Sequence, residues 1–271
     1  MTDQYAVMGN PISHSKSPYI HTLFAQQSQQ DLEYSAIEVP LNGFSQAVKS
    51  FTATQGRGLN ITVPFKQEAW KLVDTHSERA IRAQAVNTII VNSDNSLTGD
   101  NTDGLGMLAD ISRNHSINIQ GLDVLVIGAG GAVRGVLEPL IKTNPKSITI
   151  VNRTITRAQE LASNFSDLAT ISVIEFEQLA NETPYDLVIN GTSASLAGEL
   201  PPLPDQLLTP GACCYDMMYS DQQTIFVQWA LTHGATTALD GLGMLVEQAA
   251  ESFQLWRGIR PNTASVISAL R

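Results

Sequence analysis

Cysteine is nearly absent from this chain of 271 residues. The only two cysteines are adjacent, at Cys213 and Cys214, and they lie within an apolar stretch. A pair of neighbouring cysteines provides neither a disulfide framework nor the spaced ligands of a zinc site. We therefore predict that both are buried as small hydrophobic residues, and we expect no metal site.

Basic residues are also scarce, with 16 Lys and Arg against 26 Asp and Glu and a formal net charge of -10 at pH 7. No local cluster of Lys and Arg offsets this balance. A chain of this kind does not neutralise a phosphate backbone, so we expect no nucleic-acid partner. A small anionic substrate can still bind through local hydrogen-bond donors.

Long apolar runs are missing as well. None approaches the ~20 residues that a membrane span needs, and the opening MTDQYAV lacks the basic and apolar regions of a secretory signal. We expect a cytoplasmic protein with no membrane partner. The 43% hydrophobic and 15% charged composition is that of an ordinary globular protein, and the length suffices for two domains.

The first hundred residues alternate between short apolar runs and amphipathic stretches. This pattern predicts a βαβαβ unit followed by a helix after Pro64 and then a hairpin. The expected strands are 5–8, 34–39 and 59–63, the helices are 18–29, 44–51 and 65–73, and the hairpin strands are 87–92 and 97–99.

The second half of the chain contains uninterrupted apolar strands that are typical of a buried parallel sheet. We predict strands at 122–127, 148–151, 187–189 and 212–215, with crossover helices at 132–142, 157–164 and 225–232. Residues 200–210, with four prolines, are predicted to be a loop. The helical segment 244–256 is expected to pack back on the first domain.

A glycine cluster follows the strand at 122–127 and precedes a helix. Backbone N–H groups and a helix N-terminus can hold a dinucleotide pyrophosphate at such a turn. The cluster is Gly128, Gly130 and Gly131, followed by Ala132, and it departs from the G-x-G-x-x-G pattern because Val133 occupies the last position. A purely structural glycine turn is the alternative interpretation.

The end of the next strand indicates which dinucleotide would bind. An acidic residue there accepts the 2'-hydroxyl of NAD, whereas an arginine accommodates the 2'-phosphate of NADP. This chain has Asn152, Arg153 and Thr154 at that point, with Arg157 one helical turn later. The pattern favours NADP, and two ordinary surface arginines are the alternative.

Polar side chains gather around the predicted start of the helix at 65–73. Asn60 and Thr62 share one face of their strand, and Lys66 lies at the positive end of a helix, where propensity alone does not place it. Asp103 could orient Lys66 and tune its proton affinity, or could simply cap a helix. Lys66, in turn, could simply be solvated.

A hydroxyl-rich loop at 13–18 precedes the first helix and suits either a small carboxylate or an ordinary helix cap. His14 in this loop has no evident partner, so a solvated role is preferred over an acid or base role.

Eight segments, in this order along the chain, resemble the shikimate dehydrogenase family. They are residues 9–18 (GNPISHSKSP), 60–66 (NITVPFK), 85–88 (AVNT), 99–104 (GDNTDG), 128–132 (GAGGA), 152–154 (NRT), 215–217 (YDM) and 240–248 (DGLGMLVEQ). Each motif alone is modest, but the set covers the chain from end to end. Gln84 and Gly191 depart from the family pattern, which has Gly before Ala-Val-Asn-Thr and often Ala before Thr-Ser.

The resemblance implies a role for each group of residues. Lys66 and Asp103 would form the catalytic dyad. The substrate would be surrounded by Ser15, Ser17, Asn60, Thr62, Asn87, Tyr219 and Gln248. The cofactor would contact Gly128, Ala129, Gly130, Gly131, Ala132, Asn152, Arg153, Thr154, Arg157, Met217 and Gly241.

We therefore expect a two-domain α/β enzyme that reversibly reduces 3-dehydroshikimate to shikimate with NADPH, in the biosynthesis of aromatic amino acids. Residues 1–102, completed by 242–271, would form the α/β substrate-binding and catalytic domain, and 103–241 the Rossmann-like NADP domain. A monomer or a homodimer fits equally well.

Two rival interpretations stay open. A related dehydrogenase that prefers quinate or uses NAD would share the fold. A non-catalytic NADP sensor would bind NADPH without turnover, although the presence of both Lys66 and Asp103 argues against it.

Overall fold

The computed structural model describes residues 2–271 and separates the chain into two compact units. The first unit contains the residues up to Gly106 together with Val246–Arg271, and the second is Met107–Leu245. Both divisions fall inside helices, α5 (Asp103–Ala109) and α9 (Leu242–Arg257). The predicted boundaries, 102 and 241, are the residues directly before these helices begin.

The first unit is built on a mixed six-stranded sheet with strand order β2-β1-β3-β5-β6-β4. Its first three strands are parallel, and β5 and β6 form an antiparallel hairpin, as the sequence predicted. The strands are β1 (Asp3–Gly9), β2 (Leu32–Glu38), β3 (Gly56–Ile61), β4 (Thr75–His76), β5 (Thr88–Val91) and β6 (Leu97–Asp100). The two-residue β4 was not predicted, because it is too short to carry a periodic pattern.

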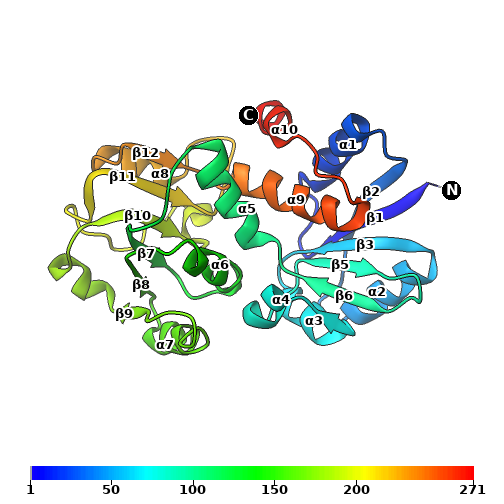
Figure 1. Ribbon diagram of the computed structural model, residues 1–271, viewed down its shortest axis with the longest axis horizontal. Helices are drawn as coiled ribbons and strands as arrows, with labels where there is room; N and C mark the ends of the chain where they lie inside the picture. Colours follow the sequence, from blue (N-terminus) through cyan, green and yellow to red (C-terminus); the bar gives the residue numbers. More distant parts are fainter. Residues whose placement is uncertain (1) are drawn as a thin grey trace. The chain divides into compact units, whose positions relative to one another are not determined.

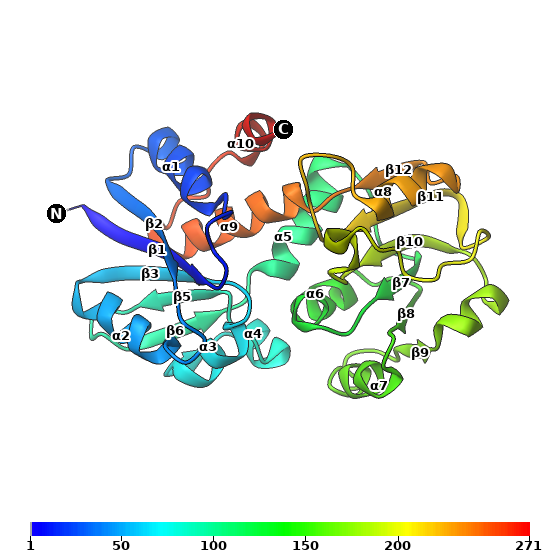
Figure 2. The ribbon, with the colours of Figure 1, turned by 180° about the vertical axis from the view of Figure 1, so that it is seen from behind.

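Helices cover both faces of this sheet. They are α1 (Ser17–Ser28), α2 (Phe44–Ala53), α3 (Lys66–Leu72), α4 (Glu78–Ala83), α10 (Thr263–Leu270) and the parts of α5 and α9 in this unit. Figures 1 and 2 show α1 and α9 on one side and α2 and α3 on the other. Alternate residues of β1 pack accordingly, since Ala6 joins the cluster of α2 and α3 while Tyr5 joins one with Trp256 of α9.

The predicted strand at 59–63 is shifted in the structure. β3 begins earlier, at Gly56, and ends at Ile61. The backbone of Thr62 still donates to the carbonyl of Met8 over 2.9 Å, so the extended path continues for a short distance beyond the strand. The predicted alternation of side chains between the two faces of the strand is present at Asn60 and Ile61. Ile61 packs in the cluster with α2 and α3, whereas Asn60 bonds to Ser252 of α9.

The second unit is a parallel six-stranded sheet with strand order β12-β11-β10-β7-β8-β9. The strands are β7 (Asp123–Ile127), β8 (Ser147–Val151), β9 (Ser172–Ile174), β10 (Tyr185–Asn190), β11 (Leu208–Asp216) and β12 (Thr237–Leu239). The α-helices are α6 (Gly131–Lys142), α7 (Ile155–Ser163), α8 (Ile225–Thr232) and the parts of α5 and α9 in this unit, with shorter helical segments η1 (Asp110–Asn114), η2 (Phe176–Asn181) and η3 (Ala194–Ala197). The order reverses between β7 and β10, which is where doubly wound sheets hold their ligands.

The core of this unit lies on both faces of the sheet. Val124 and Val126 pack with α6 and α7, whereas Leu125 and Ile127 pack with α8. The adjacent cysteines follow the same alternation, since Cys213 joins the first cluster and Cys214 the second. Both cysteines are buried, which confirms the prediction, and burial raises the pKa of Cys213 to about 12.

The predicted loop at 200–210 was partly wrong, because β11 already begins at Leu208 and includes Pro210. Leu208 pairs with Tyr185, but the next pair is Cys213 with Leu187, so the strand is irregular between them. An irregularity of this kind accommodates a proline that cannot donate to the ladder. The high proline content therefore led to the prediction of a loop where the first residues of β11 lie.

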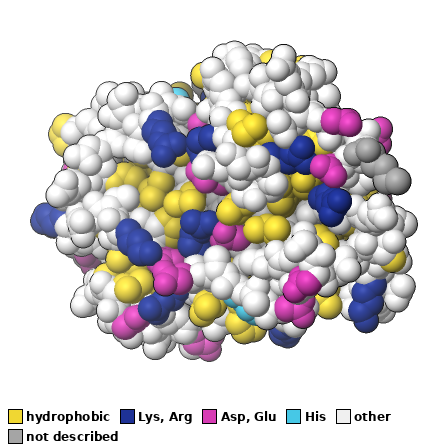
Figure 3. All heavy atoms as spheres, turned by 45° about the vertical axis from the view of Figure 1, so that its right-hand side comes forward, with side chains coloured by type: hydrophobic (Ala, Val, Ile, Leu, Met, Phe, Trp, Pro, Cys, Tyr) yellow, Lys and Arg dark blue, Asp and Glu magenta, His cyan; other side chains and the backbone are white. Residues whose placement is uncertain are grey.

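Charges of both signs are interspersed over the face of the molecule in Figure 3. Among residues 2–271, no helix is long and apolar enough to cross a membrane. No group of three or more His, Cys, Asp and Glu side chains that could hold a metal ion occurs within the same described residues.

Candidate active site

Lys66 and Asp103 form an ion pair in the first unit, with Nζ 2.6 Å from Oδ2. Each residue is the first of a helix, α3 for Lys66 and α5 for Asp103. The lysine side chain is 22% exposed and the carboxylate 8%. The pair thus combines a largely buried carboxylate with a lysine that still reaches solvent, as a group that exchanges protons with a ligand requires.

Asn87 holds the other oxygen of Asp103. Its Nδ2 donates to Oδ1 of Asp103 over 2.8 Å and to Oε1 of Gln248 over 3.3 Å. Its own Oδ1 accepts from the backbone N–H of Thr102 at 2.9 Å and from the hydroxyl of Thr88 at 2.8 Å. The two Asp103 oxygens are therefore divided between a lysine and an amide, and the carboxylate is fixed in orientation.

The remaining residues predicted to bind substrate from the first unit lie on β3, α1 and the loop before α1. Asn60 is 6% exposed, and Ser17 is 7% exposed at the start of α1. The backbone N–H of Ser17 donates to the hydroxyl of Ser15 over 3.3 Å. Thr62, directly after β3, is half-buried. His14 is exposed in the same loop as Ser15, as expected for a solvated side chain.

The glycine cluster of the second unit joins β7 to α6 at the reversal of strand order. Gly128 has a φ of +109°, which favours glycine, and a Cβ there would lie 3.1 Å from Thr192 in the loop after β10. A Cβ added at Gly130 or Gly131 would meet no atom within 4 Å. Open space in front of exposed backbone at the start of a helix suits a pyrophosphate.

The loop after β8 carries the residues predicted to contact the 2'-phosphate. Asn152 Nδ2 donates to the carbonyl of Thr154 over 2.8 Å, which braces the turn into α7. Arg153 and Arg157 are exposed. Over residues 2–271 neither guanidinium pairs with a carboxylate, so both are available to an anionic ligand.

Met217 and Gly241, predicted to lie by the cofactor, are in direct contact. A Cβ at Gly241 would lie 2.3 Å from the carbonyl of Met217, so the loop after β11 and the start of α9 can approach only with glycine at this position. Tyr219 belongs to the same unit and is half-buried. Burial, with Asp221 nearby, raises the pKa of Tyr219.

The sequence did not single out Asp216, which organises this loop. It is fully buried at the end of β11, and burial raises its pKa. Its carboxylate accepts from Thr224 at 2.6 Å, from Asn190 at 3.0 Å and from the backbone of Met218 at 3.1 Å. The position of Asp216 within the motif 215–217 was the available signal.

The first unit holds three further unpredicted residues, Tyr34, Thr88 and Ser252, all hydrogen bonded to Asn60. Thr88 closes the motif 85–88, and Ser252 is one helical turn after Gln248, so spacing could have indicated both. Tyr34 carried no signal, because it lies in a strand with no recognised motif.

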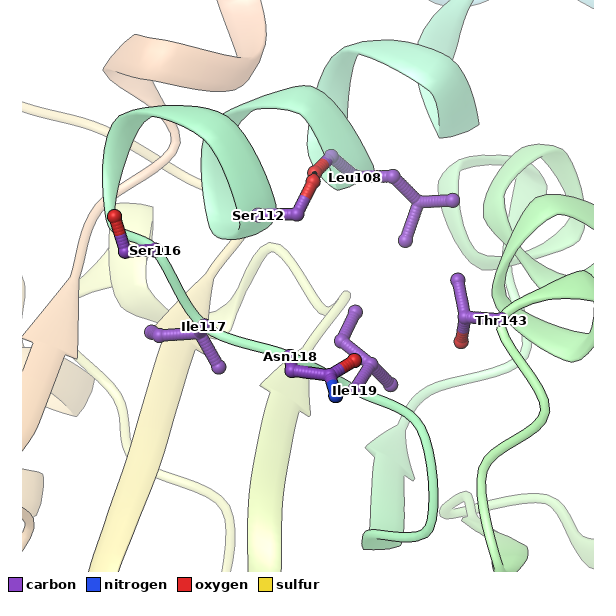
Figure 4. A pocket seen from close by; sticks show the side chains of 7 residues that line it. All are labelled: Leu108, Ser112, Ser116, Ile117, Asn118, Ile119 and Thr143. Atoms are coloured by element: carbon purple, nitrogen blue, oxygen red, sulfur yellow. Dashed lines mark hydrogen bonds between the residues drawn. The ribbon is translucent and has the colours of Figure 1, made fainter.

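A separate pocket of about 300 Å³ lies within the second unit. Figure 4 shows its lining side chains, which are Leu108, Ser112, Ser116, Ile117, Asn118, Ile119 and Thr143. None of them was predicted as a site residue. Its lining contains no His, Cys, Lys, Arg, Asp or Glu side chain, so it offers no acid or base for catalysis.

Comparison with known families gives matches along most of the chain. The shikimate dehydrogenase substrate binding domain matches residues 7–89, shikimate / quinate 5-dehydrogenase matches 109–197, and the shikimate 5'-dehydrogenase C-terminal domain matches 241–271. The shikimate dehydrogenase (NADP(+)) of Alkalilimnicola ehrlichii is 59% identical over 271 residues, covering 100% of this chain and 99% of that protein.

Solved structures agree with these matches. An Ael1 enzyme from Pseudomonas putida is 44% identical with a TM-score of 0.93, covering 99% of this chain and 98% of that one. Shikimate 5-dehydrogenase from Thermus thermophilus, in complex with NADP(H) and shikimate, is 30% identical with a TM-score of 0.88, covering 98% of each chain.

Proposed function

The chain belongs to the shikimate dehydrogenase family, and we propose that it reduces 3-dehydroshikimate to shikimate with Lys66 as the proton donor. The reaction is reversible, uses NADP and belongs to the shikimate pathway that leads to aromatic amino acids. One observation supports the residue assignment above all others, the 2.6 Å pair of Lys66 and Asp103.

The second unit has a site that fits NADP. Gly130 and Gly131 leave the open space that a pyrophosphate needs, and a side chain there would fill it. Arg153 and Arg157 would pair with the 2'-phosphate, because a guanidinium forms bidentate hydrogen bonds with phosphate. The bound cofactor supplies a hydride to the ketone carbon of the substrate.

Lys66 completes the reduction. Negative charge develops on the former ketone oxygen as that carbon is reduced, and Nζ of Lys66 donates a proton to it. In the direction of shikimate oxidation, the same nitrogen accepts the proton. Asp103 holds Nζ in position through Oδ2. Asn87 donates a hydrogen bond to Oδ1, and this bond prevents the carboxylate from rotating.

The other residues would bind the substrate's carboxylate and hydroxyls. In the first unit these are Ser15, Ser17, Asn60, Thr62, Asn87 and Gln248, which offer hydroxyl and amide groups without a fixed charge. The family resemblance also gives Tyr219 as a substrate residue, and its phenol would be another neutral partner. Several neutral partners can share the binding, so the loss of one is expected to weaken affinity without abolishing it.

A direct assay tests the function. The purified protein is mixed with NADP and shikimate, and the absorbance of the reduced cofactor is followed. We expect rapid reduction of NADP. If NADP is not reduced at any shikimate concentration, the proposal is refuted. Quinate is the second substrate to compare, because the family that matches residues 109–197 includes quinate dehydrogenases. A higher kcat/KM for quinate would reassign the substrate and leave the chemistry of Lys66 in place.

A further inference from the structure

The carboxamide of Asn60 is hydrogen bonded at both ends by buried groups. Its Oδ1 accepts from the hydroxyl of Tyr34 at 2.7 Å. Its Nδ2 donates to Ser252 Oγ at 2.9 Å, Thr88 Oγ1 at 3.2 Å and the backbone carbonyl of Asn87 at 3.2 Å. The backbone carbonyl of Asn87 can only accept a hydrogen bond, so the side-chain nitrogen of Asn60 must face it. The side-chain oxygen of Asn60 therefore faces Tyr34.

Tyr34 also lies near a second predicted substrate residue. The side chain of Ser17, the first residue of α1, is close enough to this phenol to affect its pKa. Burial raises the pKa of Tyr34 well above its usual range, so the phenol keeps its proton and can donate to Asn60. The hydroxyl thus orients Asn60 of β3 directly.

The ring of Tyr34 is itself held in place. It stacks on the imidazole of His21, with centroids 4.1 Å apart and planes 4° from parallel. Trp256 of α9 packs against it at a centroid distance of 6.3 Å. Because the ring is packed on these neighbours, its hydroxyl is presented at one position, which is the condition for orienting other groups.

We propose that Tyr34 is a positioning residue, which fixes the Asn60 carboxamide in the orientation that binds substrate. This inference rests on the proposed function, since it takes Asn60 as a substrate contact. The phenol of Tyr34 bonds to Asn60 and not to Lys66 or Asp103. Its loss should therefore weaken the binding of shikimate and leave proton transfer by Lys66 nearly intact.

Tyr5 provides a matched control in the neighbouring strand. It pairs directly with Tyr34 in the β1–β2 register, and it is 3% exposed in the same cluster of buried residues. Its hydroxyl accepts from the guanidinium of Arg257 at 3.4 Å. Tyr5→Phe therefore removes a buried phenol hydroxyl from the same layer while leaving the Asn60 contacts in place.

The test compares wild type, Tyr34→Phe and Tyr5→Phe by steady-state kinetics, by calorimetric titration with shikimate and by thermal unfolding. For Tyr34→Phe we expect KM and Kd for shikimate to rise about 5- to 20-fold, the size expected for losing one buried hydrogen bond. Its kcat and its KM for NADP should stay within about twofold of wild type. Tyr5→Phe should leave all of these constants unchanged, whatever its effect on Tm.

An unchanged Kd in Tyr34→Phe, or an equal rise in Tyr5→Phe, would overturn the inference. In an Asn60→Ala background, Tyr34→Phe should lose most of its effect on Kd, and a full effect there would also overturn it. If Tyr34→Phe fails to fold, Ser252→Ala removes support from the nitrogen side of the amide and should raise the Kd in the same way. A wild-type protein that neither binds nor oxidises shikimate would instead refute the proposed function.

Discussion

Replacing Lys66 by Ala removes the proposed proton donor and little else. Within residues 2–271, the only hydrogen bond of Nζ is the 2.6 Å contact with Asp103, and the partners of Asn60 and Asn87 do not include Lys66. The binding groups should keep their arrangement. Loss of a positioned acid typically lowers the rate ~10²- to 10⁴-fold, or about 3 to 5 kcal/mol of transition-state stabilisation. We expect this loss in kcat, with only a few-fold change in the KM for shikimate.

The assay follows reduced cofactor in both directions for Lys66→Ala, for Asp103→Asn and for the double variant. Asp103→Asn keeps the shape but removes the charge that orients the lysine, so turnover should also fall. If the two groups act as a unit, the double variant should be little worse than the poorer single one. Lys71→Ala, in the last turn of the same helix, is the control and should keep its kcat.

Two results would refute this reasoning. A near-normal kcat for Lys66→Ala would remove the proposed acid and reopen the choice to His14, Tyr219 or water. Full multiplicativity of the two losses would show that Lys66 and Asp103 act independently.

Three further predictions concern the cofactor and the core. Arg153→Asp should lower kcat/KM for NADP about 10- to 100-fold and narrow or invert the preference over NAD, which kinetics with both cofactors measures. Gly130→Ala should fold normally, because Gly130 has φ -84° and ψ -177° and open space ahead, yet weaken NADP binding in a titration. Burial lowers the pKa of His21 from 6.5 to about 3. Between these two values the unfolded chain binds a proton that the folded chain does not, so the free energy of unfolding decreases as the pH falls. The free energy of unfolding of His21→Phe should therefore fall less steeply than that of wild type between pH 6.5 and 3.5, by at most about 1.4 kcal/mol per pH unit, and equal slopes in denaturant unfolding would contradict this.

Much of the fold was predictable because each unit has a clear local pattern. The strands at 122–127 and 148–151 are continuous apolar runs. The two strands of the hairpin after Asn87 are separated by turn-forming residues. The edge strands β4, β9 and β12 were missed because they are only two or three residues long, so pairing with a neighbour defines them. The start of β11 was missed because its proline is tolerated by a local irregularity.

The residues of the candidate site were likewise predicted only where a local sequence pattern indicated them. Lys66 was singled out because helix propensity alone does not place a lysine there, and the glycine cluster because it joins a buried strand to a helix. The pairing of Lys66 with Asp103 as a dyad came from the resemblance to the shikimate dehydrogenase family. Tyr34 and Ser252 were not predicted, because their importance comes from contacts with Asn60 across 26 and 192 positions of the chain. Pairings at such separations depend on the finished packing, which a single sequence does not display.

The return of α9 to the first unit has a consequence for synthesis of the protein. Residues 107–245 are continuous, so the second unit has its whole sequence available before the C-terminal residues are translated. The first unit must wait, because Ser252 and Phe253 belong to its interior. Translation proceeds from the N-terminus, so the earliest residues of the chain are the last to acquire a complete core. Until α9 is translated, the Asn60 amide lacks its hydrogen bond to Ser252, so the first unit is completed only after the second unit has been translated.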